Sequence, residues 1–416
     1  MPQSPTVTTP ADPPQGALAG KRVVVGVSGG IAAYKAVEVI RRLVDAGAHV
    51  APIMTNAAHR FIGETTLSAL SSEPVQKSLW DEDSPIPHTR LGQGADAVVV
   101  VPATARIIGS YAAGISNDLL TATLLATRAP VVVCPAMHTE MWEHAAVQEN
   151  LATLRRRGVH IVDPEPGRLA GGDVGHGRLA APATIVAGVE RALGPNDLAG
   201  LKVLITAGGT REAIDPVRVI SNRSTGKQGY ALAAAAHARG ADVTLVTTVD
   251  REPPPGVEIV PVTSAASMQD AVMPRASDTD VIIMAAAVAD FRPATVADHK
   301  IKKGDGIDAI PLERTHDFLV DLGEAKPDGQ TLVGFAAETS DLEANARGKL
   351  ERKRLDLIVA NDVSMENVGF AHDTNEVLII SADAVRPVPL ADKRVIADAV
   401  LDAVVTARGG APAVNP

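Results

Sequence analysis

Residues Lys202 to Ala231, KVLITAGGTREAIDPVRVISNRSTGKQGYA, decide the fold because they have a near twin close to the start of the chain, KRVVVGVSGGIAAYKA at Lys21 to Ala36. Each stretch is a short β-branched run that breaks into glycines and small hydroxyl residues and then enters an alanine-rich helical pattern. An α/β domain presents backbone N–H groups and a helix N-terminus to a phosphate in this way. The two strand exits lie about one domain length apart, so the sequence predicts two nucleotide-type sites on one chain.

Short apolar runs alternate with longer helical patterns along both halves of the chain. They lie at 23–27, 49–55, 95–103, 129–137 and 159–163 in the first half, and at 202–207, 241–248, 257–262, 278–290, 330–338, 355–362 and 375–381 in the second. Runs that are apolar throughout are typical of strands with helices on both faces of the sheet. We therefore predict an α/β fold with two Rossmann-like domains, built on mainly parallel, doubly wound sheets.

Turn-forming and low-complexity segments set the expected boundaries. We predict a disordered tail at 1–19, a domain at 20–193, a linker at 194–200, a second domain at 201–408 and a disordered tail at 409–416. Within the first domain, the glycines and prolines of 163–178 predict a mobile loop rather than a regular element.

Composition narrows the class of protein. The formal net charge of -10, the pI near 5.6 and the aromatic content of 2% argue against nucleic-acid binding. The single cysteine, Cys134, excludes an intramolecular disulfide and fits a reducing compartment. The sequence has neither an apolar run of the ~20 residues needed to span a bilayer nor a recognisable signal peptide. We therefore expect a cytoplasmic protein without a membrane partner.

The first glycine turn allows more than one interpretation. Its sequence, GVSGG at 26–30, has the spacing of a serine-hydrolase nucleophile elbow, but it follows the first strand, whereas the elbow normally follows several. It fails the dinucleotide pattern G-x-G-x-x-G. A mononucleotide phosphate bound by Ser28, the neighbouring N–H groups and Thr55 fits better. Asp250, just after the second strand of the second half, keeps an NAD-dependent oxidoreductase open as an alternative.

Two histidines and two polar turns complete the candidates in the first half. The segment PATA at 102–105 follows a buried strand, on the usual ligand side of an open α/β sheet, and Asn117 lies in a turn that could cap a helix. His88 follows two prolines and is expected in a rigid exposed turn. His138 stands where a strand gives way to a helix. Neither histidine belongs to a zinc-binding spacing.

The second half combines glycine turns with lysines. The segment GGTRE at 208–212 would present successive N–H groups to an anion, and NRSTGKQG at 222–229 crowds amide, hydroxyl and glycine residues before a helix. Cations that converge on such an edge are what a triphosphate with its magnesium requires. A solvated helix face remains the alternative for the basic run at 347–356. The lysines in question are Lys300, Lys302, Lys303, Lys349 and Lys353.

Over nearly its whole length the chain resembles the bacterial bifunctional phosphopantothenoylcysteine decarboxylase / phosphopantothenate-cysteine ligase family of coenzyme A synthesis. The first half is similar to flavin-dependent cysteine decarboxylases through GVSGGIAAYKA, His88, PATA, GISNDLL and PAMHTEMW. The second half is similar to the ligase through ITAGGTREAIDPVRVISNRSTGKQGYA, AAAVADFRP, KIKK, GFAAET and KLERKRLDLIVANDV. The resemblance implies a flavodoxin-like flavoprotein domain followed by a ligase domain.

For the first half, the resemblance implies an FMN cofactor. The family oxidises a cysteinyl group, loses CO2 from it and reduces the resulting enethiol to 4'-phosphopantetheine. By this resemblance His88 and His138 would act in catalysis. The implied flavin-binding residues are Gly26, Ser28, Gly29, Gly30, Ile31, Thr55, Pro102, Ala103, Thr104, Asn117 and Met137.

Two positions depart from the family pattern. The substrate motif P-x-M-N-x-x-M-W has His138 in place of its asparagine, and the flap motif A-C-G-D-x-G-x-G-R-M has Gly171 in place of its proton-donating cysteine. Asp173, His176 or water would then deliver the proton, while Cys134 is expected to serve packing. We expect CO2 release to survive. The alternative is an active ligase joined to a weakened or non-catalytic flavin-binding half.

For the second half, the resemblance implies that CTP activates 4'-phosphopantothenate to an acyl-cytidylate, which the amine of cysteine then attacks. Asn222 and Lys300 would act in catalysis, with Mg2+ on the CTP phosphates. The family also implies trimers through the flavin domain and dimers through the ligase domain, hence a larger homo-oligomer such as a dodecamer. The implied substrate-binding and nucleotide-binding residues are Gly208, Gly209, Thr210, Arg211, Ala287, Asp290, Lys300, Phe335, Lys349 and Lys353.

Overall fold

The computed structural model describes residues 17–80, 85–302, 309–338, 341–362 and 372–410. Most of the tail predicted at 1–19, Lys303 and most of the tail predicted at 409–416 therefore lie outside the described residues. The chain divides into two compact units, Met1–Gly194 and Pro195–Pro416. Within the described part, every helix is too short or too polar to cross a membrane.

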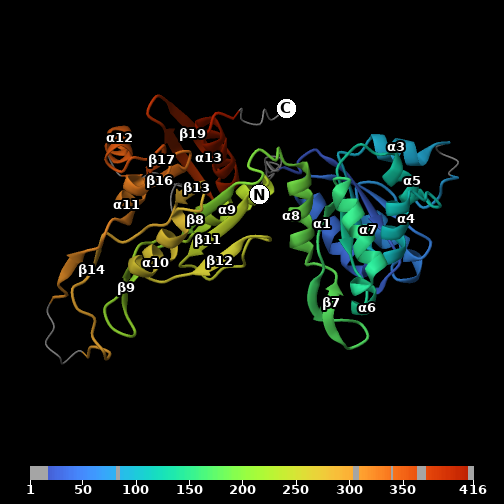
Figure 1. Ribbon diagram of the computed structural model, residues 1–416, viewed down its shortest axis with the longest axis horizontal. Helices are drawn as coiled ribbons and strands as arrows, with labels where there is room; N and C mark the ends of the chain where they lie inside the picture. The colour runs from blue at the N-terminus through green and yellow to red at the C-terminus, as the bar shows by residue number, and fades with distance from the viewer. Residues whose placement is uncertain (1–16, 81–84, 303–308, 339–340, 363–371, 411–416) are drawn as a thin grey trace, which may run out of the picture. The chain divides into compact units, whose positions relative to one another are not determined.

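The N-terminal unit is a parallel sheet between two layers of helices (Figure 1). Strand β3 is AVVVVPA, and all seven of its residues are buried, which requires cover on both faces of the sheet. The strand order is β2-β1-β3-β4-β5, with β1 (Arg22–Val27), β2 (His49–Met54), β3 (Ala97–Ala103), β4 (Val131–Pro135) and β5 (His160–Ile161). This order is the flavodoxin-like order, as expected.

The helices of this unit form two core layers. One layer contains α1 (Ala36–Asp45), α2 (Glu64–Leu70) and α8 (Pro182–Leu193), and the other contains α3 (Pro87–Gln93), α4 (Ala105–Ala113), α5 (Leu119–Ala126) and α7 (Ala145–Arg156). Shorter helices stand at the ends of strands and are η1 (Ile31–Lys35), η2 (Ala58–Arg60) and α6 (Thr139–Glu143).

The C-terminal unit is built on an eight-stranded sheet ordered β12-β11-β8-β13-β16-β17-β18-β19. The first six strands in this order are parallel, and β18 and β19 are antiparallel. The bounds are β8 (Lys202–Ala207), β11 (Asp242–Thr247), β12 (Glu258–Pro261), β13 (Val281–Met284), β16 (Thr331–Glu338), β17 (Leu357–Asp362), β18 (Thr374–Ile380) and β19 (Val385–Asp392). The mainly parallel sheet is confirmed, but β19, an edge strand with two prolines, was not predicted.

Helices cover both faces of this sheet as well. Helices α9 (Lys227–Ala238) and α13 (Lys393–Ala407) pack on one face, while α10 (Ala265–Ala276), α11 (Phe318–Ala325) and α12 (Leu342–Arg352) pack on the other. Arg239, only 5% exposed, joins this layer to the start of the unit, because its guanidinium donates to Asp197 at 2.9 Å and to Asp402 of α13 at 2.8 Å.

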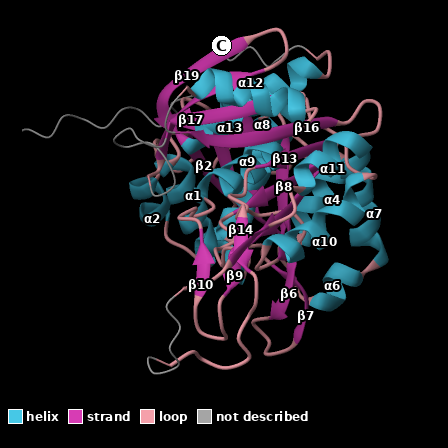
Figure 2. Ribbon diagram, turned by 90° about the vertical axis from the view of Figure 1, so that its left-hand side faces the viewer, coloured by secondary structure: helices cyan, strands magenta, loops and turns pink. Residues whose placement is uncertain are grey.

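Two small hairpins extend from the C-terminal unit on long loops (Figures 1 and 2). They are β9 (Arg211–Ala213) with β10 (Val219–Ser221), and β14 (Phe291–Pro293) with β15 (Leu312–Arg314). The buried carboxylate of Asp215 accepts hydrogen bonds from Arg218 N at 2.8 Å and from Ile301 N at 3.1 Å. The Arg218 guanidinium holds the pKa of Asp215 well below its usual range. Asp215 therefore fixes the loop that carries Lys300 to the first hairpin.

Two local predictions were wrong. Residues 163–178 form an antiparallel hairpin, β6 (Glu165–Arg168) with β7 (Val174–Arg178), rather than an irregular loop. The strands are glycine-rich and lack the β-branched residues that mark most strands, so their pairing leaves little trace in the sequence. His88 lies in the first turn of α3 and is half-buried, because Pro87 starts a helix there instead of an exposed turn.

Gly229 permits the close approach of α9 to β8. A Cβ at this position would lie 2.5 Å from Ala207 Cβ and 3.0 Å from the carbonyl oxygen of Thr206. We expect Gly229→Ala to lower the free energy of unfolding of the C-terminal unit by about 1–3 kcal/mol, because neither neighbour is a flexible side-chain end. Urea denaturation measures this change. Gly348→Ala in α12 is the matched control, since nothing lies within 4 Å of its added Cβ; equal effects of the two substitutions would contradict the prediction.

Candidate active sites

The first site lies at the carboxyl end of the N-terminal sheet, beside β1 and β3. The chain leaves β1 for one side of the sheet and β3 for the other, and such switch points are where open α/β sheets bind ligands. A cavity of about 860 Å³ lies at this edge. Its volume is in the range of about 300–1,000 Å³ typical of cofactor pockets.

Seven of the predicted residues line this cavity together. The hydroxyl of Ser28 lies behind the wall, where it donates to the carbonyl oxygen of Pro102 at 2.6 Å and accepts from Thr104 N at 3.2 Å. Ser28 is 1% exposed, so it fixes the wall of the cavity. The lining residues among those predicted are Gly29, Gly30, Ile31, Pro102, Thr104, Met137 and His138.

Other predicted residues of this half are not part of the lining. Thr55 is buried, with its hydroxyl 3.4 Å from the carbonyl oxygen of Val27, and Asn117 is exposed. Gly26 lies within β1 and Ala103 within β3, and a Cβ at Gly26 would meet Leu120. His88 is absent from the lining, although its Nδ1 is buried and has no hydrogen-bond partner among the described atoms.

Cations around the cavity were missed by the sequence analysis. The ammonium of Lys35 donates to the carbonyl oxygen of Leu179 at 3.3 Å, and burial, together with the neighbouring Arg178, lowers its pKa. Four positive side chains line this cavity. These side chains belong to Lys35, Arg106, Arg168 and Arg178.

The β6–β7 hairpin forms a flap beside this cavity. Met137 N donates to the carbonyl oxygen of Gly177 at 3.0 Å, and the hydroxyl of Thr139 donates to that of His176 at 2.9 Å. At the flap tip, Asp173 Oδ2 lies 3.0 Å from His138 Nε2. A Cβ at Gly171 would lie 3.1 Å from the same nitrogen. The two positions that depart from the family pattern are therefore neighbours in space.

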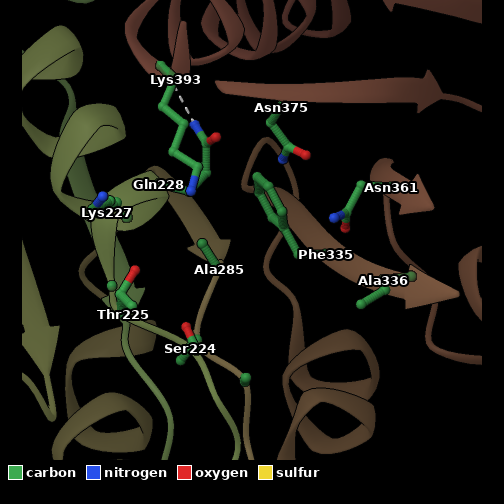
Figure 3. A pocket seen from close by; sticks show the side chains of 15 residues that line it. Ser224, Thr225, Lys227, Gln228, Ala285, Phe335, Ala336, Asn361, Asn375 and Lys393 are labelled. Carbon is green, nitrogen blue, oxygen red and sulfur yellow. Dashed lines mark hydrogen bonds between the residues drawn. The ribbon is translucent and has the colours of Figure 1, made fainter. Parts of the chain in front are cut away.

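The second site lies at the switch point of the C-terminal sheet, beside β8 and β13. Figure 3 shows its polar side chains around the ring of Phe335, with Lys393 and Asn375 on one side and Asn361 on another. The pocket has a volume of about 90 Å³. It is lined by residues 224–229 at the start of α9, 285–287 after β13 and 335–337 of β16, together with Asn361, Asn375 and Lys393.

The lining of the second site combines a helix N-terminus with buried polar groups. Gly226 has a φ of 75° at the start of α9. Asn375 is 5% exposed, and its Oδ1 has no hydrogen-bond partner among the described atoms; the same holds for Gln228 Oε1. Lys393 is 6% exposed and donates to the carbonyl oxygen of His372 at 2.6 Å. Burial, together with Lys227, lowers the pKa of Lys393 to about 8.

The predicted residues of this half are only partly brought together. Ala287 and Phe335 line the pocket, and the amide of Asn222 donates to the carbonyl oxygen of Ala287 at 3.0 Å. The turn at 208–211, which contains the predicted Gly208, Gly209, Thr210 and Arg211, is bonded to the same segment, with Ala287 N donating to the Gly208 carbonyl oxygen at 2.8 Å. These residues support the pocket from behind.

Besides Asn222 and the turn at 208–211, four more predicted residues lie outside the lining. Asp290 and Lys300 are exposed. Lys349 is paired with Glu338 at 2.6 Å, and Lys353 with Asp317 at 2.7 Å. Within the described residues, no group of three or more histidine, cysteine or acidic side chains is placed to hold a metal ion.

Comparison with known proteins covers both units. The family model "Flavoprotein" matches residues 12–194, and "DNA/pantothenate metabolism flavoprotein C-terminal domain" matches residues 198–407. The "Coenzyme A biosynthesis bifunctional protein CoaBC" of Mycobacterium tuberculosis is 49% identical over 408 residues, which cover 94% of this chain and 97% of that protein. The chain belongs to this family of bifunctional coenzyme A biosynthesis proteins.

Two further relatives have the same name as the Mycobacterium tuberculosis protein. The protein of the same name from Mycolicibacterium smegmatis is 51% identical over 382 residues, covering 88% of this chain and 92% of that one, and the Vibrio vulnificus protein is 47% identical over 397 residues, covering 94% and 99%. A crystal structure of the C-terminal domain of a CoaBC protein matches at 43% identity with a TM-score of 0.44, covering 51% of this chain and 97% of that one.

Family membership identifies the chain as a two-activity enzyme of coenzyme A biosynthesis, with a flavoprotein decarboxylase half and a ligase half. The first cavity fits a flavin by three features: its volume, its position at the β1/β3 switch point and its cationic lining.

Three polar residues that line the second pocket were not predicted. Asn361 could have been predicted from the sequence, because it stands at the carboxyl end of a predicted strand. Asn375 and Lys393 carry no comparable signal.

Loss of the Ser28 hydroxyl should disturb the flavin cavity, because this hydroxyl fixes the cavity wall although it does not line the cavity. We expect Ser28→Ala to leave the buried Pro102 oxygen and Thr104 N–H without this partner, which lowers the unfolding free energy of the N-terminal unit by about 1–3 kcal/mol. Flavin retention should fall with it, as measured by visible absorbance after gel filtration. The exposed Ser116→Ala serves as control. Full flavin retention and unchanged stability in Ser28→Ala would refute this role.

Proposed function

We propose that the C-terminal unit ligates cysteine to 4'-phosphopantothenate with CTP through an acyl-cytidylate. The N-terminal unit, with FMN, then decarboxylates 4'-phosphopantothenoylcysteine to 4'-phosphopantetheine. The observation that carries the ligase proposal is the second pocket, where the α9 N-terminus, Lys227 and Lys393 meet a buried amide oxygen with no described partner. A nucleotide supplies phosphates to the cations and N–H groups, and an exocyclic amine to that oxygen.

The ligase chemistry requires two polyanions to be held together. Backbone N–H groups at the start of α9 and the ammonium groups of Lys227 and Lys393 would screen the nucleotide phosphates. Phe335 offers a ring for the base. Lys300, on the loop fixed by Asp215, is proposed to close over the triphosphate, and Lys349 and Lys353 are proposed to contact its phosphates, with Mg2+ on them. Asn222 is proposed to orient the acyl group, and Asp290 to bind the cytidine.

In the decarboxylase half, FMN would accept a hydride during oxidation of the cysteinyl group and return it at the end. The turn at 29–31 and the segment 102–106 would hold the flavin at the switch point. Arg106, Arg168 and Arg178, which line the cavity, would bind phosphate groups of flavin or substrate. His138 and the flap hairpin would cover the reacting cysteinyl group.

The position of His88 bears on the oligomeric state of the protein. It does not line the cavity of its own chain, so the proposed catalytic role requires a cavity completed by another copy. We propose a homo-oligomer with trimers through the flavin half and dimers through the ligase half. The β9–β10 and β14–β15 hairpins of the C-terminal unit support the proposed dimer, because these hairpins and their loops expose several large apolar side chains. These belong to Val217, Val219, Phe291, Val296, Ile310 and Leu312.

The alternative is an active ligase whose flavin half has lost its chemistry. It is favoured by Gly171, which offers no thiol, and by Cys134, which is buried and not part of the cavity lining. Separate assays of pyrophosphate and CO2 release distinguish the two. The alternative predicts pyrophosphate without CO2.

The variant Asn222→Asp tests whether the two activities have separate sites. The aspartate cannot donate to the Ala287 oxygen and adds charge beside the proposed acyl phosphate, so pyrophosphate release should fall at least about a hundredfold. CO2 release from supplied 4'-phosphopantothenoylcysteine should be unchanged, because Asn222 belongs to the other unit. Asn345→Asp, exposed on α12, is the matched control. Equal loss of both activities would contradict separate sites.

Lys393 predicts a pH dependence of nucleotide binding. Its pKa is lowered to about 8, so the ammonium is present below that pH and is lost as the pH rises through it. The affinity for CTP should therefore fall between pH 7 and pH 9, by up to about tenfold. Isothermal titration calorimetry measures this slope. In Lys393→Met the slope should disappear; an identical slope in the variant would rule out Lys393 as its source.

A further inference from the structure

His138 joins the flap to the body of the N-terminal unit. It follows β4 and precedes α6, and its Nε2 lies 3.0 Å from Asp173 Oδ2 at the flap tip. Its Nδ1 is hydrogen-bonded to Glu140 of α6. A neutral imidazole carries one N–H only, whereas the imidazolium donates from both nitrogens. The two carboxylates therefore favour the protonated ring.

The electrostatic surroundings of the ring support this state. The hydrogen bond to Glu140, followed by the charges of Glu140 and Asp173, raises the pKa of His138. The other charged groups on the same cavity oppose protonation, since they are the cations Lys35, Arg106, Arg168 and Arg178. The carboxylates therefore favour the protonated ring, while the cations favour release of its proton to a base.

Gly171 places no side chain beside the Nε2 atom. A side chain at Gly171 would place its Cβ 3.1 Å from Nε2 and 3.5 Å from Asp173 Oδ2. Glycine avoids this close contact, and the adjacent Leu169 and Ala170 line the cavity. His138 itself lines the cavity, so its ring is accessible to a bound substrate.

The other candidate donors are less suitable. Cys134 is fully buried, does not line the cavity, and burial raises the pKa of its thiol. His176 is also outside the lining. Guanidinium groups do not release protons at neutral pH. Lys35 and Tyr34 do line the cavity, so the experiment must separate them from His138.

We propose that His138 is the general acid of the decarboxylase half and delivers its Nε2 proton to the carbon that has lost CO2. The inference rests on the proposed function. Loss of CO2 leaves an enethiolate, and transfer of the proton breaks the N–H bond and forms a C–H bond as the thiolate becomes a thioaldehyde. This step changes no oxidation state. His138 is left neutral and regains a proton from water, while Asp173 and Glu140 act as positioning residues.

The first test uses the full-length, flavin-loaded enzyme and supplied 4'-phosphopantothenoylcysteine. In His138→Asn and His138→Gln, CO2 release should persist while 4'-phosphopantetheine formation falls about 10²–10⁴-fold. A product lighter by two hydrogen atoms should accumulate, detected by mass spectrometry. Adding Gly171→Cys to His138→Asn should restore part of the lost rate, because the new thiol would lie next to residue 138.

The second test does not depend on turnover. Asp173→Asn removes one of the carboxylates that stabilise the imidazolium, so the ring should lose its proton at a lower pH. Nuclear magnetic resonance titration of the His138 ring in the substrate-free protein measures this shift. The basic limb of the pH–rate profile for 4'-phosphopantetheine formation should move by the same amount. Asp163→Asn, an exposed carboxylate of the same unit, is the control.

Several outcomes would overturn the inference. Unchanged 4'-phosphopantetheine formation in both His138 variants would do so, as would an equal loss of CO2 release, or an Asp173→Asn profile that does not move. Loss of the second step in Lys35→Gln or Tyr34→Phe, with the His138 variants active, would assign the proton to those groups. If the wild-type enzyme releases no CO2 from this substrate, the proposed function itself fails and the inference falls with it.

Discussion

The exits of neighbouring strands are hydrogen-bonded to each other at both switch points. In the N-terminal unit the Ser28 hydroxyl, just after β1, bridges the Pro102 oxygen and Thr104 N–H at the end of β3. In the C-terminal unit the segments after β8 and β13 exchange bonds through Gly208, Thr210 and Ala287. Strand exits that diverge leave backbone groups without ladder partners, and buried groups of this kind are costly. These local bonds satisfy them, and both pockets take their walls from the segments so fixed.

The sequence was informative where local geometry decides the outcome. A glycine turn after an apolar strand can be recognised from its residues alone, and the turn at Gly29 and Gly30 does line the first cavity. Lys393 was not foreseeable, because its position depends on how the antiparallel strands β18 and β19 return the chain to the pocket. Lys349 and Lys353 are one helical turn apart, yet each faces a carboxylate of its own. Spacing along a helix does not reveal which neighbour another segment supplies.

Positive side chains line the two pockets of a chain whose net charge is negative. The chain has a formal net charge of -10, but cations line both pockets. Local positive potential within an acidic protein attracts anionic substrates to the sites without making the whole surface adhesive for polyanions. Beside the first cavity the carboxylates of Glu140 and Asp173 contact His138, so cations that could bind an anion lie close to groups that stabilise a protonated ring.

The lining of the second pocket has a consequence for protein synthesis. Its residues come from 224–229 at one extreme and from Asn361, Asn375 and Lys393 at the other. A ribosome therefore has to release almost the entire chain before this pocket can close around a nucleotide. The N-terminal unit ends at Gly194, and among the described residues its sheet contains only β1 to β5. A growing chain could thus complete its flavin cavity while its nucleotide pocket is still unfinished.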